Sequence, residues 1–223
     1  MKKNGRKVLV IDIGGTNVKL LVSGEEEPRK FPSGPGLTPG EMVKGVRANT
    51  TDWHYDVISM GIPAPVVRGV MLHEPVNLGT GWVGYDFKKA FGKPIKIMND
   101  AAMQALGSYE GNTMLFLGLG TGLGTALVAD GTVVPMELGH VPYKKDRTFE
   151  EYVGTAGLER LGKEKWMEEV FDVVALLKAA LVADYVVLGG GNSKKLKDAL
   201  PEGVRRGDNK NAFVGGFRLW QSE

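Results

Sequence analysis

The chain has 223 residues, of which 43% are hydrophobic and 24% are charged, and its formal net charge is +2. This balance is typical of a soluble globular protein with a buried core, and it excludes disordered and fibrous proteins. Cysteine is absent, which excludes disulfides, thiol catalysis and cysteine-ligated zinc. Because the apolar stretches are too short for a secretory signal or a membrane-spanning helix, we expect a cytoplasmic protein without a membrane partner.

The first segment of the chain reads as two strands joined by a turn. Residues 8–13 and 18–22 are predicted strands, and residues 14–17 form a tight glycine-bearing turn between them. Residues 28–40 are rich in proline and glycine and predict a loop without a helix, whereas residues 41–52 predict a helix.

Alternating elements continue through the middle of the chain. A third strand is predicted at residues 57–62, before a long irregular segment at residues 63–84. A helix at residues 85–91, a strand at residues 95–98 and a helix at residues 101–108 follow.

The last third of the chain predicts mainly helices. Residues 149–161 and 164–183 have helical periodicity, and residues 185–188 form a buried strand before three glycines and a short helix. Residues 211–220 are predicted to form an apolar helix.

The segment 9–22 recurs as the segment 115–128, each with a glycine turn between apolar stretches. The aligned positions are identical at Leu9 and Leu115, Gly14 and Gly120, Leu21 and Leu127, and Val22 and Val128. This favours a duplicated protein, although two unrelated glycine-turn hairpins would give the same pattern. We expect a small N-terminal α/β domain at residues 1–110 and a C-terminal α/β domain at residues 111–210. The helix at residues 211–223 should pack back on the N-terminal domain.

The first hairpin has the composition of a phosphate-binding site. Its candidate donor-binding residues are Asp12, Gly14, Gly15, Thr16, Asn17 and Lys19. Glycines let backbone N–H groups approach an anion closely, and the Asp12 carboxylate could hold Mg²⁺ against phosphates, directly or through water. The alternative is a plain β-hairpin whose glycines supply positive φ angles.

The second hairpin alternates glycine with leucine and threonine at residues 118–124. It is not a Walker A loop, because no Lys-Ser or Lys-Thr pair follows. A second phosphate-gripping turn is the better interpretation, with Gly120, Thr121 and Gly122 as its candidate residues and Thr121 as the hydroxyl donor.

These hairpins resemble the two phosphate motifs of the actin/hexokinase superfamily, and Ile-Asp-Ile-Gly-Gly-Thr at residues 11–16 is similar to the ROK sugar kinases. Further segments resemble that family in the same order: residues 61–66, 77–82, 99–100, 137–140, 149–152 and 189–193. The resemblance implies an α/β protein with the duplicated actin/hexokinase-like (ribonuclease H-like) fold. Two mixed α/β domains would lie around a cleft.

The resemblance also implies a reaction and roles for individual residues. A phosphoryl group would pass from polyphosphate or ATP, with Mg²⁺, to the 6-hydroxyl of glucose. Asp100 suits the catalytic base, although it could also be the N-cap of the following helix. The implied sugar ligands are Asn99, Asp100, Glu137, His140 and Glu150, and Gly189, Gly190 and Gly191 would face the donor.

One departure from the family concerns zinc. Most ROK proteins insert a cysteine-rich zinc loop between the segments equivalent to residues 137–140 and 149–152, whereas this chain has only the short charged bridge 141–148. The polyphosphate glucokinases resemble the chain in lacking that loop, so we place it nearest to them. No zinc is expected.

Alternative functions stay open at this point. Kinases for fructose, mannose or an N-acetylhexosamine use the same ring of polar residues, and a non-catalytic sugar-binding regulator could share the fold. No nucleic-acid partner is expected, and a homodimer, common among related enzymes, is left open. A basic cluster could carry polyphosphate or be a solvated surface; its members are Lys194, Lys195, Lys197, Arg205, Arg206 and Lys210.

Overall fold

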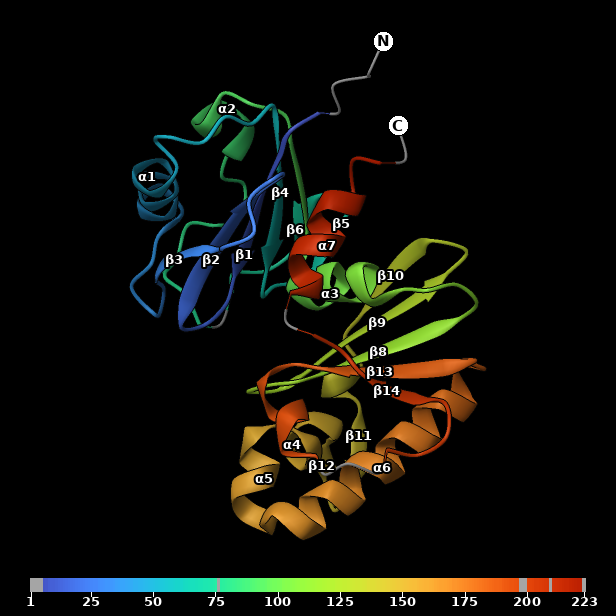
Figure 1. Ribbon diagram of the computed structural model, residues 1–223. Helices are drawn as coiled ribbons and strands as arrows, with labels where there is room; N and C mark the ends of the chain where they lie inside the picture. Colours follow the sequence, from blue (N-terminus) through green and yellow to red (C-terminus); the bar gives the residue numbers. More distant parts are fainter. Residues whose placement is uncertain (1–5, 76, 197–199, 209, 222–223) are drawn as a thin grey trace. The chain divides into compact units, whose positions relative to one another are not determined.

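The computed structural model of the protein describes residues 6–75, 77–196, 200–208 and 210–221 (Figure 1). The chain divides into two compact units. Unit 1 comprises Met1–Met103 with Ala212–Glu223, and unit 2 comprises Gln104–Asn211. The division falls within helix α3 (Asp100–Ser108) rather than at residue 110.

Unit 1 is built on a five-stranded sheet with the order β3-β2-β1-β4-β7. Its strands are β1 (Val8–Ile13), β2 (Asn17–Val22), β3 (Arg29–Pro32), β4 (Val57–Ile62) and β7 (Ile95–Asn99). β2 pairs antiparallel with β1 and β3, whereas β1, β4 and β7 run parallel. The remaining elements are α1 (Pro39–Asn49), α2 (Phe87–Phe91) and the short hairpin β5 (Val66–Val67) and β6 (Val70–Met71).

Both faces of the unit 1 sheet are covered, which explains why every residue of β1 is buried. Leu9 and Ile11 pack in one core with residues of α1 and α2. Val8 and Val10 point to the other face and pack with Phe213 of α7 (Asn211–Arg218). In Figure 1, α1 and α7 accordingly lie on opposite sides of the strands.

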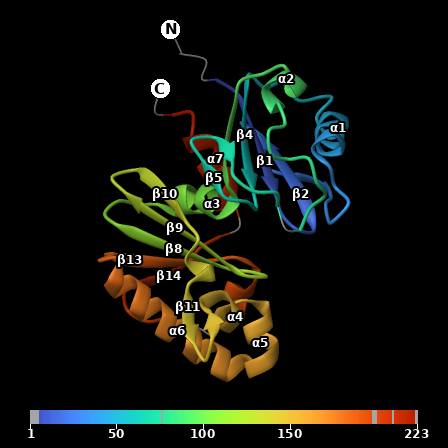
Figure 2. The same cartoon turned by 180° about the vertical axis from the view of Figure 1, so that it is seen from behind.

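Unit 2 repeats this plan with a sheet of order β10-β9-β8-β13-β14. Its strands are β8 (Met114–Leu119), β9 (Leu123–Ala129), β10 (Thr132–Met136), β13 (Tyr185–Gly189) and β14 (Val204–Arg206). The helices α4 (Phe149–Val153), α5 (Thr155–Leu161) and α6 (Lys163–Ala180) cover one face of this sheet (Figure 2). Short elements complete the unit: η1 (Leu138–His140), β11 (Pro142–Lys144), β12 (Arg147–Thr148) and η2 (Gly191–Lys195).

The two sheets share one topology, strand for strand. In each, the first strand pairs antiparallel with the second and parallel with the fourth, and the fourth pairs parallel with the fifth. The turns differ in length, because Ile13 pairs with Val18 in the first hairpin but Leu119 pairs with Leu123 in the second. This common topology confirms the duplication indicated by the repeat and agrees with the actin/hexokinase-like fold implied by the family resemblance.

Some predicted elements were wrong in type or extent. The segment predicted as a loop contains β3, and α1 begins at Pro39 because Thr38 caps it with a capping box to Glu41. The predicted helix 149–161 is broken at Gly154, where a β-carbon would lie 2.6 Å from the backbone oxygen of Thr121. The edge strands β10 and β14 were not predicted.

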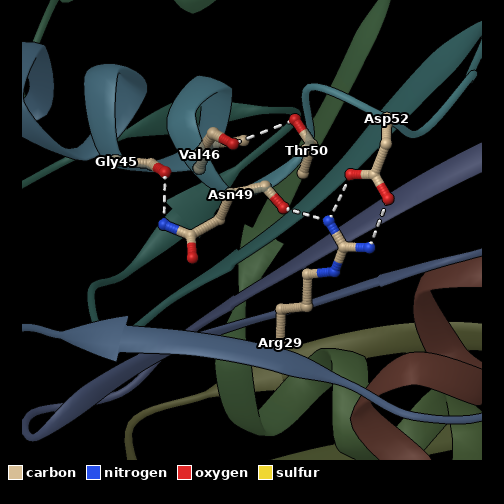
Figure 3. A network of polar contacts seen from close by, with 6 residues as sticks. All are labelled: Arg29, Gly45, Val46, Asn49, Thr50 and Asp52. Carbon is tan, nitrogen blue, oxygen red and sulfur yellow. Dashed lines mark hydrogen bonds and ion pairs between the residues drawn. The ribbon is translucent and has the colours of Figure 1, made fainter.

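A surface network ties β3 to the end of α1 (Figure 3). The Arg29 guanidinium donates to both carboxylate oxygens of Asp52, at 2.5 and 2.7 Å, and to the backbone oxygen of Asn49 at 2.8 Å. The hydrogen bonds from Arg29 to the Asp52 carboxylate lower the pKa of Asp52 to about 2. The network helps to hold a short edge strand that the sequence pattern does not reveal.

Within the described residues, no helix has both the length and the apolar character needed to cross a membrane.

Candidate functional site

The first hairpin places a carboxylate and an ammonium side by side in unit 1. Asp12 and Lys19 are register partners on β1 and β2, and the Lys19 Nζ donates to the Asp12 Oδ2 at 3.1 Å. The Asp12 side chain is 7% exposed and the Lys19 side chain 40% exposed. The carboxylate is therefore nearly buried, and a cation at the rim compensates its charge.

The glycines of this turn are not required by the backbone conformation. Neither Gly14 nor Gly15 has a positive φ angle. A β-carbon would approach no closer than 3.4 Å to the Asn17 oxygen at Gly14, and 3.8 Å to the Asn77 Cβ at Gly15, which are ordinary contacts. The positive-φ alternative is therefore wrong for this turn, and the absence of side chains is better explained by the approach of a ligand.

Ser33, directly after β3, fixes the same turn. Its Oγ donates to the Gly14 oxygen at 2.5 Å and its N–H donates to the Thr16 oxygen at 3.0 Å. In a trans peptide the C=O and the following N–H point in opposite directions, so the Gly15 N–H points away from Ser33. Sequence analysis missed Ser33 because β3 itself was not predicted.

The second hairpin is fixed in the same way within unit 2. The Gly120 oxygen accepts hydrogen bonds from the Thr155 N–H, the Thr155 Oγ1 and the Asn192 Nδ2, each at 3.0 Å. The N–H of the exposed residue Thr121 must then point away from this cluster. Thr155 was not a sequence candidate, because only the folded chain brings it to the turn.

Close packing explains why Gly122 and Gly139 of unit 2 are glycines. At Gly122 a β-carbon would collide with the Glu150 carboxylate, and at Gly139 it would lie 2.7 Å from the Leu123 oxygen. Gly122 therefore makes room for one of the predicted sugar ligands.

Glu137, His140 and Glu150 form a loose polar cluster in unit 2. The His140 Nδ1 lies 3.9 Å from the Glu137 Oε2, and the His140 Nε2 lies 3.7 Å from the Glu150 Oε1. Burial raises the pKa of Glu137, and the nearby Glu150 raises it further, while His140 opposes the shift. The His140 side chain is 66% exposed, so hydroxyl groups of a ligand could reach the cluster there.

Asn99 and Asp100 stand where β7 ends and α3 begins. The Asn99 Oδ1 accepts from the Ala102 N–H at 3.1 Å, and its Nδ2 donates to the Ala64 oxygen at 3.3 Å. The capping role considered for Asp100 therefore belongs to Asn99. Asp100 is the first helical residue, and its Oδ1 accepts from the Ala101 N–H at 2.8 Å.

The three glycines at the end of β13 and directly after it are explained in different ways. Gly189 packs against the Phe116 ring, and Gly190 combines a φ of 78° with close contact to the Leu119 backbone. A β-carbon at Gly191 would meet nothing within 4 Å. Gly191 is thus the position of the three where open space, rather than packing, accompanies the glycine.

The loop before α2 is anchored by a buried tryptophan. The Trp82 side chain is fully buried, and its Nε1 donates to the Leu37 oxygen at 3.2 Å. The Glu74 carboxylate accepts from the Trp82 N–H at 3.0 Å and from the Val83 N–H at 3.2 Å. This clamp brings Asn77, within the predicted sugar-side loop, next to Gly15.

The basic cluster of unit 2 is partly compensated. Arg205 pairs with Glu110 and stacks over the Tyr185 ring, and the Arg206 Nη2 donates to the Leu196 oxygen at 2.9 Å. Lys194 and Lys195 are exposed, whereas Lys197 lies outside the described residues. A polyanion would meet fewer uncompensated charges here than the sequence suggests.

The residues present fit Mg²⁺ held mainly by substrate. Within the described part of the chain, no group of three or more histidine, cysteine, aspartate or glutamate side chains is arranged to hold a metal ion. Mg²⁺ commonly takes one or two protein carboxylates and completes its shell with water and phosphate oxygens. Asp12, nearly buried beside the turn, suits that arrangement.

Solved structures define the class of fold. The polyphosphate/ATP-glucomannokinase of Arthrobacter sp. strain KM superposes with a TM-score of 0.81 at 22% identity, covering 98% of this chain and 99% of that one. A ROK family glucokinase from Streptomyces griseus, solved with glucose and AMPPNP, gives a TM-score of 0.73 at 15% identity, covering 97% and 100%. The fold is therefore the actin/hexokinase-like fold of the ROK sugar kinases.

Proteins similar in sequence to the chain are sugar kinases with different substrates in their names. The polyphosphate glucokinase of Mycobacterium tuberculosis (strain ATCC 25618 / H37Rv) is 25% identical over 214 residues, covering 86% of this chain and 80% of that protein. The N-acetylmannosamine kinase of Vibrio vulnificus (strain CMCP6) is 31% identical over 140 residues, but covers only 55% and 47%. No protein-family model matches the chain. The resemblance to ROK sugar kinases, with polyphosphate glucokinases among the relatives, is confirmed.

Proposed function

We propose that the protein is a kinase that transfers a phosphoryl group from polyphosphate or ATP to the 6-hydroxyl of glucose. The observation that carries this proposal is the pair of matched turns, one in each unit. In both, a carbonyl is held by a hydroxyl group and the next N–H is turned outward. Outward N–H groups on side-chain-poor turns are suited to phosphate oxygens.

Donor binding would use these turns together with charge. Thr16 and Thr121 are both exposed and can add hydroxyl donors, and the Lys19 ammonium can meet a phosphate at the rim. Asp12 would hold Mg²⁺ through water. The metal, when bound, would neutralise charge that develops on the donor phosphates.

Acceptor activation would fall to Asp100. A carboxylate oxygen would take the proton from the sugar 6-hydroxyl as that oxygen forms its bond to phosphorus and the bridging bond to the rest of the donor breaks. Asn99 fixes the start of α3 through Ala102 and Ala64, and therefore fixes the backbone that carries Asp100. The second Asn99 amide hydrogen can donate to a sugar hydroxyl.

Sugar recognition would use Glu137, His140 and Glu150. Their carboxylates and imidazole offer hydrogen-bond acceptors and donors to sugar hydroxyls, and a wrong sugar would leave some of these groups unpaired. The clearance that Gly122 leaves for Glu150 supports a role for that carboxylate.

A second candidate is N-acetylmannosamine kinase activity, favoured by the higher identity to that relative over part of the chain. It would use the same base and donor groups, so only the acceptor differs. The homodimer and the lack of zinc stay predictions, which light scattering and elemental analysis can check.

The test is a matrix of purified protein with each donor and each acceptor. We expect glucose to be phosphorylated faster than mannose, fructose or N-acetylmannosamine, with ATP, polyphosphate or both. If kcat/KM were higher for N-acetylmannosamine than for glucose, N-acetylmannosamine would be the acceptor instead. No turnover with any pair in the presence of Mg²⁺ would contradict the kinase proposal and favour a sugar-binding regulator.

A further inference from the structure

Three neighbouring hollows on unit 1 share lining residues, and together they are called the trough here. Their volumes are about 250, 520 and 450 Å³. Asp86 and Lys88 line both of the larger hollows, and Lys93 lines both the third and the smallest. The trough therefore continues from the end of α1, past α2, to the outer edge of β7. It is separate from both glycine turns.

The trough is strongly basic. Its cationic lining residues come from four parts of unit 1 and are Arg47, Arg68, Lys88, Lys89, Lys93 and Lys96. Among the described lining residues Asp86 has the one carboxylate, and its Oδ1 already accepts from the Lys89 N–H as the N-cap of α2. Like charges gathered in a hollow repel one another and attract anions.

Most of these cations have no ion-pair partner among the described residues. This holds for Arg47, Arg68, Lys88, Lys89 and Lys93. Arg47 donates to the neutral Ala90 oxygen at 2.6 Å, which orients its guanidinium without cancelling its charge. The trough thus differs from the unit 2 cluster, where Arg205 is paired.

Arg68 occupies an unfavourable backbone position. It is the first residue of the two-residue turn between β5 and β6, with a φ of 51°, and Gly69 follows with a φ of 78°. Such turns prefer asparagine, aspartate or glycine at the first position, because other side chains are strained at positive φ. An arginine kept there at a cost in local stability indicates a use for its charge.

The trough also reaches the edge of the sheet that bears the candidate site. Met98 lines its larger hollow, and Met98 is in register with Gly61, which is in register with Asp12. With neighbouring strands about 4.8 Å apart, the Met98 and Asp12 backbones lie roughly 10 Å apart. A long chain held in the trough would therefore stay close to the donor turn of unit 1.

We propose that the trough is an anchoring site for long-chain polyphosphate, distinct from the turns that hold the reacting phosphates. The proposal rests on the proposed function in taking polyphosphate as donor. A linear chain of phosphates can place successive charges against cations on α1, α2, the loop between α2 and β7, and the β5–β6 turn. Anchoring raises the effective concentration of chain ends near Asp12, so it should lower the apparent KM of long chains but not that of short ones.

The trough variant for the test is Lys88→Gln, Lys89→Gln and Lys93→Gln combined. A matched control, Lys7→Gln, Lys44→Gln and Lys165→Gln, removes the same charge from exposed sites outside the hollows. A second control, Lys194→Gln, Lys195→Gln and Lys210→Gln, addresses the unit 2 cluster. Arg68→Asn is tested alone, because asparagine suits the turn and should fold at least as stably.

Binding of fluorescently labelled long-chain polyphosphate, without sugar, is measured against salt. We expect the trough variant to bind at least about tenfold more weakly than the wild type, with a salt slope lower by roughly 0.7 per lost contact. Arg68→Asn should weaken binding severalfold, and both controls should bind as the wild type does. Turnover with ATP and tripolyphosphate should be unchanged in all variants.

Four outcomes would overturn the proposal that the trough anchors polyphosphate. These are unchanged binding in the trough variant, an equal loss in the Lys7, Lys44 and Lys165 control, a larger loss in the unit 2 variant, or tighter binding of single-stranded RNA than of polyphosphate. A failure of the kinase proposal is distinguishable, because it would abolish turnover with every donor while leaving the binding comparison intact.

Discussion

The carbonyl oxygens of Gly14 and Gly120, equivalent positions of the internal repeat, each accept a hydrogen bond from a side-chain hydroxyl group of their own unit. The Gly14 oxygen accepts from the Ser33 Oγ and the Gly120 oxygen accepts from the Thr155 Oγ1. The two hydroxyl groups come from unrelated places in the sequence, one after an edge strand and one at the start of a helix. The repeat therefore preserves the orientation of a peptide group rather than the residue that fixes it.

Removing the Thr155 hydroxyl should weaken donor binding selectively. Thr155→Val keeps the size of the side chain but loses the bond to Gly120 and the acceptor for the Asn192 Nδ2. At about 1 kcal/mol for each of the two hydrogen bonds, we expect the donor KM to rise by up to roughly thirtyfold. Steady-state kinetics at saturating glucose measures this, and Thr155→Ser is the control that should behave as the wild type. A matching rise in the glucose KM would instead indicate general loosening of unit 2.

How far the sequence predicted this site depends on the range of the contacts involved. The β1–turn–β2 hairpin follows from local apolar patterning and was correctly predicted, whereas the register that pairs Asp12 with Lys19 comes from the structure. Ser33 was missed because a short edge strand with two charged residues and a proline has no periodic signal. Thr155 and Asn192 reach the second turn only through tertiary packing, which no local pattern encodes.

The start of α3 shows a different limit. Two adjacent residues, Asn99 and Asp100, both have side chains that can cap a helix, and sequence alone does not decide between them. The structure gives the cap to Asn99 through its bond to the Ala102 N–H. Because Asn99 takes the cap, the Ala102 N–H is satisfied without the Asp100 carboxylate.

Glu137 should lower the stability of the fold at neutral pH while it contributes to sugar binding. Because burial raises its pKa in the folded chain, ionisation of Glu137 destabilises the fold at pH values above the ordinary glutamate pKa of 4.5. Glu137→Gln should therefore raise the melting temperature at pH 7, and the difference should vanish below pH 4.5. The same variant should bind glucose more weakly. Calorimetric scans at both pH values test the first statement, and a lower melting temperature at pH 7 would contradict it.

Replacing Asp100 should separate catalysis from binding. Asn keeps an oxygen that can accept from the Ala101 N–H, but it cannot take a proton from the sugar. We expect kcat to fall by ~10²–10⁴ while glucose affinity, measured by titration calorimetry, stays within a few-fold. If Asp100→Asn retained more than a tenth of the wild-type kcat, another group would be the base.

The last prediction concerns the Asp12–Lys19 pair and Mg²⁺. Asp12→Ala removes the one carboxylate of the first turn, so the Mg²⁺ concentration needed for half-maximal rate should rise at least about tenfold, with glucose binding unchanged. Lys19→Met tests the other partner. It leaves a nearly buried carboxylate without its compensating cation, which should make Asp12 a stronger site for Mg²⁺ and lower that concentration.

Kinetics at varied Mg²⁺, beside direct titration of Mn²⁺ into the protein without substrates, give two readouts for this pair. Opposite shifts in the two variants would mean that Lys19 and the metal compete for the same carboxylate. Loss of glucose binding in Asp12→Ala with a normal Mg²⁺ dependence would assign Asp12 a structural role in β1. Equal shifts in one direction would mean that the pair acts only as a unit that shapes the turn.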